Sequence, residues 1–161
     1  MNIGVFVDVQ NIYYTTREAL GRSFDYRAFW GELSSRGDVV VANAYAIKRQ
    51  DERQIKFQDA LRHIGFDVKL KPFIQRQDGS AKGDWDVGIT IDIMEAAANL
   101  DRVVLLSGDG DFAMLLRHIR DKHQVDTEVC GVRALTAQDL INSARRFTDI
   151  PARWLINGSN E

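Results

Sequence analysis

Apolar and polar positions follow two different periods along this chain. Continuous apolar runs rich in valine and isoleucine, as in strands buried on both faces, are separated by segments in which apolar residues recur every three or four positions, as on one side of a helix. The runs predict strands at 2–8, 39–47, 67–72, 102–106 and 125–131. The periodic segments predict helices at about 10–20, 26–33, 52–64, 85–99, 111–122 and 136–143.

Strands that alternate with helices predict an α/β fold. Such chains form a parallel sheet covered by helices on both faces, so we expect a three-layer α/β/α sandwich with strand order near 3-2-1-4-5. The run 67–72 alternates apolar with basic residues and ends in Pro72, which favours an edge strand. We expect one domain over residues 1–150 and a partly disordered C-terminal tail over 151–161.

Three short acidic motifs lie at the ends of these elements. Asp8 ends the first strand, and Asp109 and Asp111 directly follow the fourth, in Ser107-Gly108-Asp109-Gly110-Asp111. In the expected strand order the first and fourth strands are neighbours at the point where the order reverses, which is where such sheets bind ligands. Because carboxylates are costly to desolvate, acids at strand ends usually face a cleft or hold a cation.

The third motif, Lys82-Gly83-Asp84-Trp85-Asp86, opens a predicted helix. At about 100° per residue, a wide apolar arc contains Val87, Ile89, Ile91, Ile93, Met94, Ala97 and Ala98. Asp86 falls inside this arc and is expected to point toward the sheet, although an acid at a helix start can also simply interact with the helix dipole. Asp92 and Glu95 fall on the opposite face and are expected to be solvated.

Several polar neighbours have two interpretations. Asp109 or Asp111 could cap the following helix, but two aspartates together with Ser107 exceed what a cap needs. Asn11 either caps the first helix or orients a ligand. Lys82 either binds a carboxylate or substrate phosphate, or forms a surface ion pair.

Composition narrows the class of protein. The chain has 161 residues, 45% of them hydrophobic, which is enough for one buried core. Its single cysteine, Cys130, excludes an internal disulfide framework and a cysteine-based zinc finger. A net charge of −2 argues against a broadly basic surface. There is no signal-peptide pattern and no run near the ~18 apolar residues of a membrane span, so we expect a cytoplasmic protein without a membrane partner.

Together the motifs Asp8-Val9-Gln10-Asn11, Lys82-Gly83 with Asp86, and Ser107 to Phe112 resemble the NYN domain in its LabA-like bacterial branch. The resemblance extends from about residue 2 to 150 and implies a PIN-like fold and a metal-dependent ribonuclease acting on RNA. It implies that the catalytic acids, which also hold Mg²⁺ or Mn²⁺, are Asp8, Asp86, Asp109 and Asp111. It assigns supporting positions to Asn11, Lys82, Ser107 and Asp92, while Asp84 competes with Asp86 as a ligand.

The leading hypothesis is therefore hydrolysis of RNA phosphodiester bonds with Mg²⁺ or Mn²⁺ held by four aspartates. A second hypothesis is a non-catalytic regulator that uses the same cleft to bind RNA or a protein. A third, a phosphatase of the haloacid-dehalogenase type, requires an aspartate two residues after Asp8, where this chain has Gln10.

Overall fold

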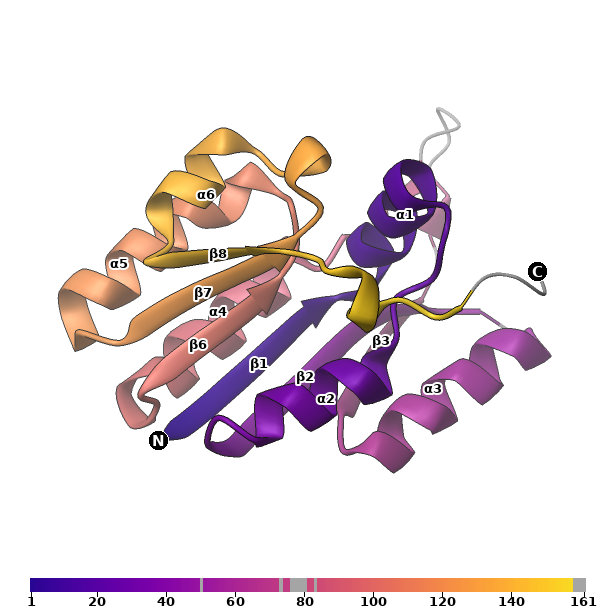
Figure 1. Ribbon diagram of the computed structural model, residues 1–161, viewed down its shortest axis with the longest axis horizontal. Coiled ribbons are helices and arrows are strands. Elements are labelled where there is room, and N and C mark those ends of the chain that lie inside the picture. Colours follow the sequence, from indigo (N-terminus) through magenta and orange to yellow (C-terminus); the bar gives the residue numbers. More distant parts are fainter. Residues whose placement is uncertain (50, 73, 76–80, 83, 158–161) are drawn as a thin grey trace.

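The computed structural model describes residues 1–49, 51–72, 74–75, 81–82 and 84–157 (Figure 1). Its strands are β1 (Asn2–Asp8), β2 (Asp38–Lys48), β3 (Asp67–Pro72), β4 (Ile74–Gln75), β5 (Ala81–Lys82), β6 (Arg102–Leu106), β7 (Asp126–Gly131) and β8 (Arg146–Asp149). Its α-helices are α1 (Val9–Leu20), α2 (Tyr26–Ser34), α3 (Glu52–Ile64), α4 (Asp86–Ala96), α5 (Ala113–His123) and α6 (Gln138–Ser143). Short 3-10 helices are η1 (Ala97–Asn99), η2 (Gly110–Phe112), η3 (Arg133–Leu135) and η4 (Ala152–Trp154).

Six strands form one sheet in the order β3-β2-β1-β6-β7-β8, and every pairing in it is parallel. This confirms the expected order for the first five of these strands and places β3 at an edge. β4 and β5 pair separately as a two-stranded antiparallel ribbon. The expectation of a parallel α/β sheet in a PIN-like fold is therefore confirmed, with one further strand at the far edge.

Helices cover both faces of the sheet (Figure 1). On one face, Val5 and Val7 of β1 pack with Ile12 of α1, with α2 and α3, and with the C-terminal segment. On the other face, the intervening β1 residue Phe6 packs with Ile93 of α4, with α5 and with α6. Because successive side chains of a strand point to opposite faces, β1 contributes to both cores, which explains why its apolar run is continuous.

Helix ends follow local signals in the sequence. The Asp25 side chain accepts a hydrogen bond from the Ala28 amide (3.0 Å), and Asp51 accepts one from the Arg53 amide (2.9 Å). Each bond satisfies an amide that lacks a partner in the first turn of its helix. Gly65 ends α3 at φ 137°, a conformation in which a side chain would be strained.

The predicted inner face of α4 is partly wrong. Ile89 and Ile93 are fully buried, whereas Val87 is 70% exposed and Ile91 and Met94 are also exposed. Apolar residues surround most of this helix, so periodicity alone could not select the face that meets the sheet. Asp86 lies three residues before Ile89 and seven before Ile93, so it still shares the buried side.

Strand β8 has no counterpart among the predicted strands. This strand has only one large apolar residue, Phe147, and it lies at a sheet edge next to β7. Beyond it, Trp154 and Leu155 are buried in the core, although the sequence placed them in a tail. The Trp154 ring lies 5.0 Å from that of Phe29 and 6.3 Å from that of Phe24. None of the described helices is both long and apolar enough to cross a membrane.

Candidate metal centre

The turns after β1 and β6 form the floor of the candidate site. The two strands pair in register, with Val7 opposite Leu106, so Asp8 and Ser107 come next to each other at the carboxyl edge of the sheet. The Ser107 hydroxyl donates a hydrogen bond to Asp8 Oδ2 (3.1 Å), and the Gly108 amide donates one to Asn11 Oδ1 (2.9 Å). Two segments almost a hundred residues apart are thereby joined at this edge.

Three carboxylates gather above this floor. Asp86, Asp109 and Asp111 each place one oxygen within 4.8 Å of the oxygens of the other two. Hard divalent cations bind oxygen at about 2.0–2.6 Å, so one ion can contact all three oxygens. Asp109 also caps η2, because its Oδ1 accepts a hydrogen bond from the Asp111 amide (2.9 Å). The expected capping role of this motif is therefore confirmed, and the same aspartate also belongs to the acidic cluster.

Asp8 lies beside this cluster and is more deeply buried than Asp86. Burial raises its pKa to about 6, against the lowering effect of hydrogen bonds from the Ser107 hydroxyl and the Asn11 backbone. The pKa of Asp86 is also raised, to about 7. Burial is the largest cause, and a hydrogen bond with Asp109 and the negative charge of Asp109 raise it further. Neighbouring carboxylates repel one another when all of them are ionised. A bound cation offsets this repulsion and so favours the charged form of each carboxylate.

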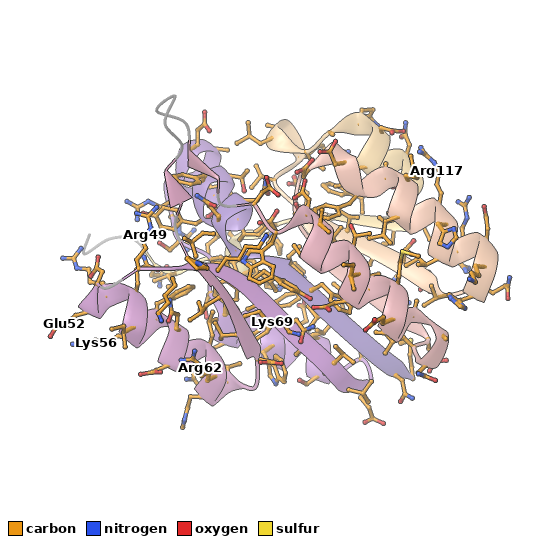
Figure 2. All side chains as sticks on the ribbon, turned by 180° about the vertical axis from the view of Figure 1, so that it is seen from behind. Arg49, Glu52, Lys56, Arg62, Lys69 and Arg117 are labelled. Carbon is orange, nitrogen blue, oxygen red and sulfur yellow. The ribbon has the colours of Figure 1, made fainter. Side chains whose placement is uncertain are left out.

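Asp92 differs from the expectation of a solvated acid, and Asp84 lies outside the acidic group. Asp92 is not simply solvated: its side chain is 25% exposed, accepts a hydrogen bond from the Tyr45 hydroxyl (2.8 Å) and pairs with Lys69 (3.3 Å). Figure 2 shows Lys69 on the face of the sheet seen from behind, on which α4 also lies. Asp84, the rival of Asp86, is exposed and accepts a long hydrogen bond (3.4 Å) from the Asp86 amide, outside the three-carboxylate group.

Ser107 and Lys82 were both predicted to support the site, but only the Ser107 side chain belongs to the described part of the structure. Ser107 is fully buried and also accepts a hydrogen bond from the Asp109 amide (3.2 Å), so one hydroxyl connects two acidic residues. Lys82 belongs to β5, but its side chain lies outside the described residues.

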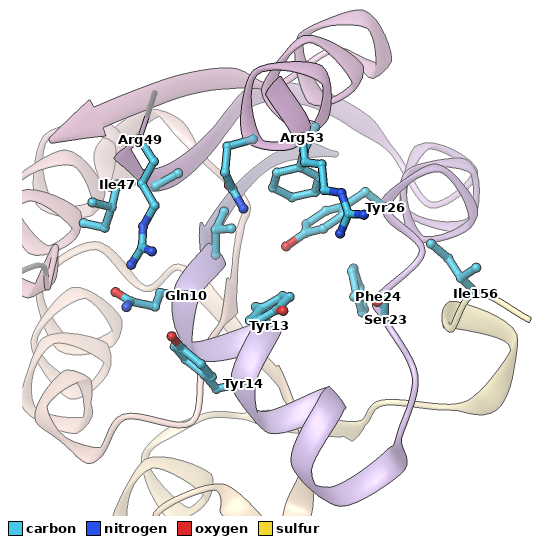
Figure 3. A pocket seen from close by; sticks show the side chains of 14 residues that line it. Gln10, Tyr13, Tyr14, Ser23, Phe24, Tyr26, Ile47, Arg49, Arg53 and Ile156 are labelled. Atoms are coloured by element: carbon cyan, nitrogen blue, oxygen red, sulfur yellow. The ribbon is translucent and has the colours of Figure 1, made fainter. Parts of the chain in front are cut away.

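Sequence reasoning missed a cavity beside the acidic residues. It has a volume of about 470 Å³ and is lined by residues from α1, α2, α3, the end of β2 and the C-terminal segment (Figure 3). Val9 and Gln10, which directly follow Asp8, form part of its wall. The available signal was Tyr13-Tyr14, two adjacent aromatic residues of α1 that cannot both face the core.

Three comparisons with known proteins find relatives of this chain. The family model described as "NYN domain" matches residues 2–151. The chain is 29% identical over 156 residues to the Low amplitude and bright protein LabA of Synechococcus elongatus, covering 92% of this chain and 83% of that protein. It also resembles a solved structure, a protein of unknown function, VPA0982, from Vibrio parahaemolyticus RIMD 2210633. That similarity has 50% identity, a TM-score of 0.92 and 96% coverage of each chain.

Proposed function

Because this chain belongs to the NYN domain family, a group of the PIN-like nuclease superfamily, we propose that it is a metal-dependent ribonuclease that hydrolyses RNA phosphodiester bonds. One observation carries the proposal: Asp86, Asp109 and Asp111 bring carboxylate oxygens within 4.8 Å of one another. Asp8 lies next to them at the carboxyl edge of the sheet, where parallel α/β folds bind their ligands.

The residues fit a hard divalent cation. All the candidate ligands are carboxylates, the type of ligand that Mg²⁺ and Mn²⁺ prefer. Within the described part of the chain, none of the four aspartates forms an ion pair with lysine or arginine. The group therefore carries negative charge that a bound cation would offset. We propose that Asp8, Asp86, Asp109 and Asp111 hold Mg²⁺ or Mn²⁺.

When bound, the metal supplies two effects: it lowers the pKa of a coordinated water and offsets charge on the scissile phosphate. The protein residues provide the geometry. Ser107 fixes the Asp8 carboxylate and the Asp109 backbone through its single hydroxyl. Asn11 holds the Gly108 amide and with it the turn that carries Asp109. Further from the centre, Asp92 fixes Tyr45 and Lys69 against α4.

A cleavage assay tests the proposal directly. Single-stranded and structured RNA are incubated with wild type, Asp8→Asn or Asp109→Asn, with Mg²⁺ or Mn²⁺ and with EDTA. Loss of a group that only supports a metal ligand already costs about 10- to 100-fold, so we expect each substitution to lower the rate by about 100-fold or more. Asp121→Asn, an exposed acid on α5 outside the centre, is the matched control.

Cleavage that survives both site substitutions would show that a contaminant is responsible. Calorimetry separates the enzyme from a non-catalytic regulator of RNA or protein binding, since the regulator predicts no Mg²⁺ or Mn²⁺ binding even with RNA present. A chromogenic phosphate ester tests the phosphatase hypothesis, which already lacks its second aspartate at Gln10.

A further inference from the structure

The cavity next to the acidic residues has the size and position of a substrate subsite. Its volume, about 470 Å³, lies within the range of about 300–1,000 Å³ typical of small-molecule sites. Val9 and Gln10 line it and immediately follow Asp8 in the chain. A group bound in this cavity would therefore lie next to anything held at the metal centre.

Aromatic side chains line this cavity without being needed in the core. Tyr13 is 48% exposed and Tyr14 is 54% exposed, and their rings meet edge to face at 5.3 Å. Both are on the first two turns of α1, and Figure 3 shows them among the side chains that line the cavity. Exposed aromatic faces in a groove are the usual platforms on which unpaired nucleobases stack.

Tyr26 presents a polar group to the cavity from a ring that is packed in the core. Its side chain is only 8% exposed, and its ring packs against those of Phe24, Phe57 and Phe66. Among the described residues, its hydroxyl has no hydrogen-bond partner, and Figure 3 shows it directed into the cavity. A ligand in the cavity can therefore hydrogen-bond to this hydroxyl, which both donates and accepts. Burial, and next the charge of Asp8, raise the Tyr26 pKa, so this wall is within electrostatic range of the acidic centre.

Positive charge lies at the same cavity, although the chain as a whole is acidic. Arg49 and Arg53 both line it, and in Figure 3 the Arg49 side chain extends toward Gln10 and the Arg53 side chain toward Tyr26. Arg53 forms no ion pair with any other described residue. Arginine beside aromatic faces matches a nucleotide, because it can contact a phosphate while the rings contact the base.

We propose that this cavity binds one unstacked nucleobase of single-stranded RNA, directly beside the scissile phosphate. Tyr13 stacks on the base, the Tyr26 hydroxyl bonds its polar edge, and Arg53 contacts an adjoining phosphate. This inference rests on the proposed function, which sets where the scissile bond lies. Bases of duplex RNA are already stacked and paired, so occupancy of the cavity requires a single strand.

Binding is measured by fluorescence anisotropy with a labelled single-stranded RNA and with the same strand in a duplex. All proteins carry Asp109→Asn in Mg²⁺, so that RNA is bound without being cut. We expect Tyr13→Ala to weaken single-strand binding by about 5- to 100-fold and Arg53→Gln or Tyr26→Phe by about 3- to 10-fold. Arg62→Gln, an exposed arginine on the same helix but outside the cavity, is expected to bind like the parent protein.

Tyr26→Phe separates ligand binding from packing. It keeps the ring and removes a hydroxyl that has no described partner, so the melting temperature should stay equal or rise while RNA affinity falls. Unchanged affinity in all three cavity variants, or equal affinity for single strand and duplex, would overturn the proposal. Absence of cleavage in wild type would contradict the proposed function alone, since the binding measurement does not depend on it.

Discussion

Asp8 and Asp86 are carboxylic acids at positions where burial disfavours their ionised form. Both have a raised pKa, with burial as the main cause, and neighbouring carboxylates add to the effect. Strongly shifted acids in one place are a feature of functional sites, because a stable protein could replace them with neutral residues at lower cost. The energetic cost that these residues impose on the metal-free protein can be measured.

In metal-free protein, Asp8→Asn should increase stability at neutral pH. The folded pKa of Asp8, about 6, lies above the ordinary value of 3.8, so the folded state binds more protons between those values. The contribution of this group to stability is complete below pH 3.8 and is lost as the pH rises through about 6. We expect a gain of about 1–3 kcal/mol above that range and none at low pH.

Thermal unfolding in EDTA across this pH range measures the effect. Adding Mg²⁺ should then stabilise wild type more than Asp8→Asn, since ligands that bind only the folded state raise its stability. A variant that is less stable than wild type at neutral pH, and closer to it at low pH, would contradict the burial argument.

Ser107 is expected to act on metal binding as a positioning residue. Its hydroxyl bonds both the Asp8 carboxylate and the Asp109 amide, so Ser107→Ala releases two parts of the centre. We expect Mg²⁺ affinity, measured by calorimetry, to fall by about 10- to 100-fold. Stability should fall by about 1–3 kcal/mol.

Ser143→Ala is the matched control. Ser143 is also fully buried, but its hydroxyl donates to the Leu140 carbonyl in α6. It should lower stability by a similar amount without changing metal affinity. Equal effects of both substitutions on Mg²⁺ binding would show that Ser107 has only a structural role.

At the scale of elements, the sequence predicted most of what local rules determine. The strands were found from continuous apolar runs, and α2 and α3 from the caps Asp25 and Asp51. The orientation of α4 and the existence of β8 could not be predicted in this way, because both depend on packing. A helix with apolar residues on most sides has no preferred face until its neighbours are known, and β8 has little apolar content of its own.

The orientation of α4 gives an element-scale prediction. Ile93 is fully buried against the sheet, whereas Ile91 on the same helix is half exposed. Ile93→Ala should lower the free energy of unfolding by about 2–5 kcal/mol, and Ile91→Ala by less than about 1 kcal/mol. Urea unfolding of the two variants measures the difference, and a larger loss for Ile91→Ala would reverse the assigned faces.

At the scale of the molecule, the acidic centre and the cavity differ in how predictable they were. The centre was predictable because Asp8 and Asp109 follow strands that the order 3-2-1-4-5 makes neighbours, and Asp86 starts a helix that packs beside them. The cavity is lined by residues of the first three helices, by the end of β2 and by Ile156, which is about a hundred residues further along the chain. No motif marks such a surface, since it exists only once three helices and the C-terminal segment have packed.

The C-terminal segment therefore links stability to the cavity, and truncation tests this link. A chain ending at residue 150 loses Trp154, which is buried against Phe24 and Phe29, and Ile156, which lines the cavity. Removal of a buried tryptophan side chain alone costs about 3–5 kcal/mol, so this truncation should destabilise by at least that amount. A chain ending at residue 157 keeps both residues and serves as the control.

Both truncations are compared by urea unfolding and by single-stranded RNA binding. We expect the chain ending at 157 to match the full chain in stability and affinity. To separate weaker binding from unfolding, Ile156→Ala is measured as well, because this exposed residue should change affinity with little effect on stability. If the chain ending at 150 were as stable as the full chain, residues 151–157 would be a tail outside the domain, and the packing of Trp154 would contribute nothing to the fold.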